Sequence, residues 1–162
     1  MLDLFRRTRA LTYMNATGKG IRKMARQVTV FFYGLFMDPE ALHARGFRPR
    51  NVRTAHVDRF RLQLGERATL VPHEGGRVHG IVMTMPHDDL DALYADDSVA
   101  AYRPEPVLAH LPDGSAEPAL CFNLPTLPAA TTRNTDYAVR LQSVARKMGL
   151  PESYVASIAD SG

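Results

Sequence analysis

The stretch VTVFFYGLFMDPEAL, residues 28–42, begins as a β-strand and breaks at Gly34. Its first residues are β-branched or aromatic, a composition typical of a buried strand. The Asp-Pro-Glu sequence at 38–40 then supplies a helix N-cap, a proline suited to the first helical position and an acidic first turn. The sequence therefore predicts a strand over 28–33, a turn, and a short helix that ends near Gly46.

Beyond this stretch, short apolar runs alternate with proline and glycine signals at a spacing typical of a mostly antiparallel sheet. Residues 57–64 alternate apolar and polar side chains, which predicts a half-buried strand. The pairs Gly75-Gly76 and Asp113-Gly114 each separate two apolar runs and predict the tips of two hairpins. The arms of these hairpins are predicted over 67–72, 77–85, 102–111 and 116–124.

Helical spacing of apolar residues and helix stop signals predict three further helices. They cover residues 86–97, residues 136–148, and a shorter segment from Pro151 to about Ile158. About six strands dominated by hairpins, with helices between and after them, indicate an α+β fold. We expect a small mixed, mostly antiparallel β-barrel with flanking helices.

The composition limits the class of protein. A chain of 162 residues fits one domain, and its 45% hydrophobic and 23% charged residues exclude a disordered or collagen-like chain. The lone Cys121 cannot form an internal disulfide, which is typical of a reducing compartment, so we expect a cytoplasmic protein in which Cys121 is a buried small apolar residue. No apolar window reaches the roughly 18 residues of a membrane span.

Positive charge is concentrated in the first 27 residues, which hold seven Lys and Arg against one Asp. Since the whole chain carries +3, residues 28–162 carry −3, and the basic balance belongs to an extension. We expect residues 1–27 to be a peripheral extension, residues 28–162 to be a single domain, and nucleic acid to be an unlikely partner. A transit peptide, an RNA- or lipid-binding arm and a misplaced start codon are alternative explanations of this segment.

The helix predicted over 86–97 carries an acid on its apolar face. At about 100° per residue, Asp97 lies on the same side as Leu90 and Leu93. A carboxylate that faces an apolar pocket is desolvated, which raises its pKa and suits it to general acid/base catalysis. The alternative is that the helix ends before Asp97, which then caps the next turn with Ser98.

Several short motifs, in their order and spacing, resemble the gamma-glutamylcyclotransferase-like superfamily. The family's opening motif, Tyr-Gly-Ser-x-(Leu or Met), is matched by YGLFM at 33–37, with Leu35 in place of the hydroxyl residue. The later motifs are matched by ATLVP at 68–72, VHGIV at 78–82, LDALYADD at 90–97, Tyr102 to Val107, and MGLPESYV at 148–155. The likeness covers about residues 28–158.

This resemblance implies a cofactor-independent reaction in which the α-amino group of a γ-glutamyl substrate attacks its own γ-carbonyl, releasing an amine and 5-oxoproline. In active relatives a helix glutamate moves the proton; in strict register Tyr94 takes its place here, and Asp97 lies three residues further on. We expect Asp97 to be the acid/base, and main-chain N–H groups of residues 34–36 to hold the substrate carboxylate. The expected substrate-binding residues are Tyr33, Gly34, Leu35, Phe36, Tyr94 and Tyr102.

A second hypothesis is a non-catalytic binding or interaction domain that retains the barrel, because Leu35, Tyr94 and Ala95 depart from the family motifs. The sequence leaves open whether the chain is an enzyme, which amine leaves, and what the oligomeric state is. Six histidines show no H-x-x-x-H or H-E-x-x-H spacing, so we expect no metal site and no cofactor.

Overall fold

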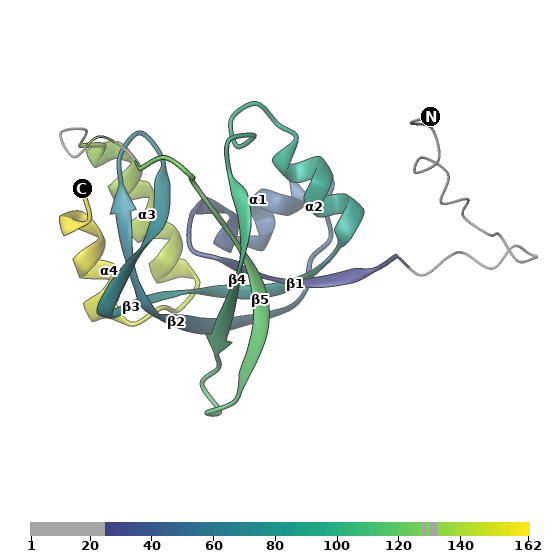
Figure 1. The fold of residues 1–162 in the computed structure, drawn as a ribbon, viewed down its shortest axis with the longest axis horizontal. Helices are drawn as coiled ribbons and strands as arrows, with labels where there is room; N and C mark the ends of the chain where they lie inside the picture. The colour runs from purple at the N-terminus through teal and green to yellow at the C-terminus, as the bar shows by residue number, and fades with distance from the viewer. Residues whose placement is uncertain (1–24, 128, 130–132) are drawn as a thin grey trace, which may run out of the picture.

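The computed structural model describes residues 25–127, 129 and 133–162, and its strands close into a barrel (Figure 1). The strand order is β1-β3-β2-β4-β5; β1 and β5 are parallel, and the other pairs are antiparallel. The strands are β1 (Gln27–Phe32), β2 (Arg50–Leu64), β3 (Ala68–Pro86), β4 (Arg103–His110) and β5 (Ala116–Asn123). The predicted fold class is confirmed. The basic segment predicted over 1–27 lies outside the described residues, except for its last three.

The helices lie in two groups. Figure 1 shows α1 (Pro39–His43) and α2 (His87–Tyr94) on one side of the barrel, and α3 (Thr135–Lys147) and α4 (Glu152–Ser157) together at the other end. Two short 3-10 helices, η1 (Leu35–Met37) and η2 (Ile158–Asp160), complete the set. The predicted N-cap is present, since the Asp38 carboxylate accepts a hydrogen bond from the Glu40 N–H at 3.0 Å. Within the described residues, no helix has the length and apolar content to cross a membrane.

The hairpin predicted at Gly75-Gly76 is wrong, because the two arms are parts of the single strand β3. The pairing of β2 with β3 shifts between Asp58↔Arg77 and Phe60↔Pro72, so the glycine pair lies in a bulge. A Cβ at Gly76 would overlap the Phe60 carbonyl oxygen, which explains why a glycine is needed there. A close backbone approach and a hairpin tip call for the same residue type, so the sequence alone did not separate them.

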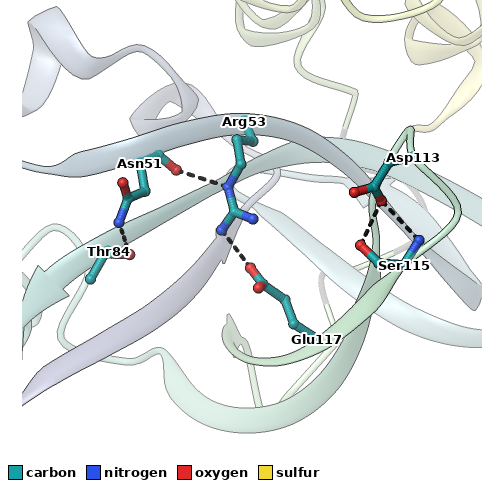
Figure 2. A network of polar contacts seen from close by, with 6 residues as sticks. All are labelled: Asn51, Arg53, Thr84, Asp113, Ser115 and Glu117. Carbon is teal, nitrogen blue, oxygen red and sulfur yellow. Dashed lines mark hydrogen bonds and ion pairs between the residues drawn. The ribbon is translucent and has the colours of Figure 1, made fainter.

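Side-chain contacts reinforce the edge of the barrel where β2 meets the β4–β5 hairpin (Figure 2). The Arg53 guanidinium forms an ion pair with Glu117 of β5 at 2.6 Å and donates a hydrogen bond to the Asn51 carbonyl at 3.3 Å. The predicted turn at the tip of the hairpin is present, and the Asp113 carboxylate accepts a hydrogen bond from the Ser115 N–H at 2.8 Å. The Arg53–Glu117 ion pair joins β2 to the hairpin at its strand β5, and the backbone of β2 pairs with the other strand of the hairpin, β4, at His56↔His110.

The packing is close where β1 pairs with β3. Phe31 is 1% exposed and Phe32 is 3% exposed, and both lie against Gly80 of β3. A Cβ at Gly80 would overlap the Phe32 carbonyl oxygen and lie 2.7 Å from the Phe31 ring. The absence of a side chain at Gly80 therefore allows β1 to approach β3 closely.

We predict that Gly80→Ala lowers the free energy of unfolding by about 3 kcal/mol, because the added methyl group displaces β1. Gly46→Ala is the matched control: nothing lies within 4 Å of its Cβ position, and its φ of 90° is the source of a cost of about 1 kcal/mol. Chemical denaturation of both variants measures the difference. Equal costs would contradict the close approach of β1 to β3.

Candidate functional site

A cavity of about 340 Å³ opens where β1 ends. Its walls come from the segment after β1, from α2 and the turn that follows it, from β5 and from the first turn of α3. All six residues predicted to bind substrate line it, namely Tyr33, Gly34, Leu35, Phe36, Tyr94 and Tyr102. The wall is aromatic and is completed by Phe31, Phe32, Phe122 and Tyr137.

The turn at Gly34 explains why apolar residues follow the first strand. The Met37 N–H donates to the Gly34 carbonyl at 3.0 Å, which closes the turn, and the Met37 side chain is fully buried. Leu35 and Phe36 are half-buried and line the cavity. The Phe36 ring meets Phe32 edge to face, with ring centroids 6.2 Å apart. The two apolar residues are therefore a wall of the cavity.

The cavity tyrosines are held as neutral phenols. The Tyr33 hydroxyl donates to the Phe122 carbonyl at 2.6 Å, and the Tyr102 hydroxyl donates to the Ala68 carbonyl. The Tyr94 ring is stacked on Phe122, with centroids 3.8 Å apart and planes 7° from parallel. Burial raises the pKa of all three phenols, because an apolar surrounding disfavours the charged phenolate.

Tyr137 occupies the space predicted for a substrate carboxylate. Its phenol oxygen is hydrogen-bonded to the main chain of Leu35 and lies 3.2 Å from the position of a Cβ on Gly34. Tyr137 stands in the first turn of α3, which begins after Asn134; the Asn134 side chain accepts from the Tyr137 N–H at 3.0 Å. The helical spacing of Tyr137 indicates a core-facing residue, and the sequence carries no signal that this face meets the turn after β1.

Three arginines, which the sequence analysis did not identify, also line the cavity: Arg45, Arg67 and Arg140. The Arg45 guanidinium lies over the Phe36 ring, 5.1 Å from its centroid, and 3.9 Å from the Asp96 carboxylate. Arg67 is half-buried in the turn between β2 and β3. These cations, with the aromatic wall, make the cavity suited to an anion with an apolar body.

The prediction that Asp97 faces inward on a continuous helix is wrong. Helix α2 ends at Tyr94, and Asp97 is exposed and does not line the cavity. The Asp96 carboxylate accepts a hydrogen bond from the Ser98 N–H at 2.9 Å, which turns the chain away from the helical path. The catalytic role expected of Asp97 depended on burial and therefore has no geometric basis. The capping residue is Asp96, whereas the alternative prediction named Asp97.

A family model described as "Gamma-glutamyl cyclotransferase, AIG2-like" matches residues 30–139. The structure is similar to that of a human protein designated loc79017, with a TM-score of 0.70, 20% identity, and 82% of this chain and 86% of that chain covered. It is also similar to a gamma-glutamyl cyclotransferase, with a TM-score of 0.68, 20% identity and the same coverage. YkqA from Bacillus subtilis gives a TM-score of 0.68 and 20% identity over 83% of this chain and 54% of that chain. No curated protein sequence matches.

Alkaline titration tests the burial of the cavity phenols. Burial raises the pKa of Tyr33, Tyr94, Tyr102 and Tyr137. The folded chain therefore keeps phenol protons that the unfolded chain releases at about pH 10. The stabilisation is present below about pH 10, and the free energy of unfolding falls as the pH rises further. We expect tyrosinate absorbance to rise together with the loss of circular dichroism. Ionisation near pH 10 with the fold intact would contradict this.

Proposed function

Because the chain belongs to the gamma-glutamyl cyclotransferase, AIG2-like family, we propose that its cavity binds a small γ-glutamyl compound without converting it to 5-oxoproline. The observation that carries this proposal is the position of Tyr94. In register with the family's helix glutamate, the chain has a phenol that is buried and stacked on Phe122. We therefore infer that the chain keeps the binding role of the family but has Tyr94 at the position of the family's acid.

The size and charge of the cavity support a ligand of this class. Its volume of about 340 Å³ lies within the roughly 300–1,000 Å³ of small-molecule sites. A γ-glutamyl compound carries at least one carboxylate, and Arg45, Arg67 and Arg140 supply guanidinium groups that suit carboxylates. The aromatic wall suits the methylene groups between the carboxylate and the γ-amide. The hydroxyl of Tyr137 is a further polar group beside the Gly34 turn.

The ionisable side chains of the cavity favour binding of the ligand without its conversion to product. Attack of the α-amino group on the γ-carbonyl needs a group that accepts one proton and returns it to the leaving amine. Among the described residues, the ionisable side chains that line the cavity are tyrosines and arginines. Burial raises the pKa of the Tyr94 phenol, so it keeps its proton at neutral pH, and an arginine does not release one. Neither type is suited to act as a general base there.

Cyclisation of the ligand to 5-oxoproline is the second candidate, and the family match favours it. Intramolecular attack needs little beyond folding the γ-glutamyl chain back on itself and stabilising the oxyanion. The guanidinium groups of the cavity are chemically suited to the second task. The two candidates differ in one measurable product.

We predict that at least one member of a panel of γ-glutamyl amino acids and amines binds with a stoichiometry of one per chain, and that none yields 5-oxoproline. Isothermal titration calorimetry measures the binding, and mass spectrometry of the incubated mixture detects the product. Arg67→Gln is expected to weaken binding about tenfold or more, since a charge-assisted hydrogen bond contributes about 1.5–3 kcal/mol. The control is Arg61→Gln, an exposed arginine of β2 outside the cavity.

The result separates the hypotheses. Binding that is equally weakened by Arg61→Gln, or absent for every compound, would exclude the proposed ligand class. Formation of 5-oxoproline by the wild-type chain would establish the second candidate in place of the first.

We predict that Asp97→Asn leaves ligand affinity within about twofold of wild type, because the charge of an exposed residue outside the cavity contributes little to binding. Loss of binding in this variant would show that the exposed acid takes part.

The double change Leu35→Ser with Tyr94→Glu restores both family residues and is expected to produce 5-oxoproline. Leu35→Ser with Tyr94→Gln is the matched control, since it has the same shape without a titratable group. Circular dichroism confirms the fold of each variant.

A further inference from the structure

Three histidines form a row across neighbouring strands on the outer face of the barrel. His56 of β2 is in register with His79 of β3 on one side and with His110 of β4 on the other. The residues beside it in β2, Ala55 and Val57, are buried, so His56 lies on the opposite, outward face of the strand. The ring centroids of His56 and His110 are 5.1 Å apart.

Asp58, two residues further along β2, lies between the two imidazoles. One of its carboxylate oxygens is 3.8 Å from Nε2 of His56, and the other is 3.8 Å from Nε2 of His110. The ligand atoms of the three residues all lie within 4.8 Å of one another. Zinc bonds of about 2.0–2.2 Å in a tetrahedral arrangement place ligand atoms about 3.3 Å apart. A single carboxylate oxygen of Asp58 lies 3.8 Å from one imidazole nitrogen and within 4.8 Å of the other, so these distances have to close by about 0.5 to 1.5 Å.

We propose that His56, Asp58 and His110 form a zinc-binding site on the outer face of the barrel, with the fourth coordination position open to water. Imidazole and carboxylate are ordinary zinc ligands, and three protein ligands leave one position for solvent. The side chains are 23%, 39% and 33% exposed in this order, which gives an ion direct access. None of the three lines the aromatic cavity, so the site is separate from the proposed ligand site.

Binding of an ion requires two local changes. The imidazole planes of His56 and His110 are 15° from parallel, so the rings must turn about χ2, a broad torsion, to direct both nitrogens at one ion. The Arg77 guanidinium, which contacts Asp58 at 2.7 Å, must also move away. The Arg77 side chain is 54% exposed and free to swing into solvent. Arg77 is thus a built-in competitor of the metal for the Asp58 carboxylate.

The sequence spacing gives no sign of this site. Metal motifs are recognised when ligands recur within one helix or loop, whereas His110 reaches His56 through strand pairing. On the other side of the row, the ring of His79 lies between His56 and Tyr154 of α4, with centroid distances of 5.5 Å and 5.1 Å.

Titration of Zn²⁺ into the full chain tests the proposal. We expect one ion per chain, and an affinity at least tenfold weaker in His56→Ala and in His110→Ala. His87→Ala is the control, because His87, Asp88 and Asp91 form a second group of converging ligand atoms among the described residues, and all three are exposed. Zn²⁺ is also expected to raise the melting temperature of wild type but not of His56→Ala. No binding by wild type, or a loss confined to His87→Ala, would overturn the proposal.

The Arg77→Gln variant tests whether Asp58 is a zinc ligand or only the ion-pair partner of Arg77. If Asp58 coordinates zinc, removal of the competing guanidinium is expected to tighten Zn²⁺ binding several-fold, and Asp58→Asn is expected to weaken it. Circular dichroism checks that both variants fold. An unchanged or weaker Zn²⁺ affinity in Arg77→Gln would overturn the role of Asp58 as a ligand.

Discussion

The hydrogen bond from the Tyr33 hydroxyl to the Phe122 carbonyl fixes the end of β1 against β5. These two strands are parallel and pair at Val30↔Leu120. The side-chain hydrogen bond therefore holds the mouth of the barrel where few backbone hydrogen bonds join the two strands. The phenol is buried, and loss of a buried partner costs more than an exposed hydrogen bond contributes. The position of the Gly34 turn, and with it one wall of the cavity, follows from this link.

The same apolar surrounding determines which chemistry the cavity suits. A phenol tolerates desolvation because it stays neutral, and Tyr94 adds a stacking contact with Phe122. A carboxylate at that position would lose its hydration, and this loss would raise its pKa. A raised carboxyl pKa is the property that an acid/base catalyst needs. A cavity lined by neutral phenols and guanidinium groups is consistent with holding an anion in place.

Much of the fold was predictable because its signals are local. The turn and helix after β1 follow from Gly34 and the Asp38 cap, and α3 follows from its helical spacing. Gly75-Gly76 was misinterpreted because a bulge and a hairpin tip need the same freedom of the backbone. The sequence placed six residues in one cavity but missed Arg67 and Tyr137, which reach it from distant segments. Periodicity placed Asp97 inward, but the cap formed by Asp96 ends the helical path first.

The wall that Tyr137 forms has a thermodynamic consequence for the whole C-terminal part of the chain. This phenol is hydrogen-bonded to the Leu35 main chain and belongs to α3. Any occupant of the cavity therefore affects how α3 docks against the barrel. An occupant that accepts the phenol's proton in a hydrogen bond tightens the docking of α3, and one that displaces the phenol loosens it. Occupancy of the cavity and docking of α3 against the barrel are therefore linked equilibria.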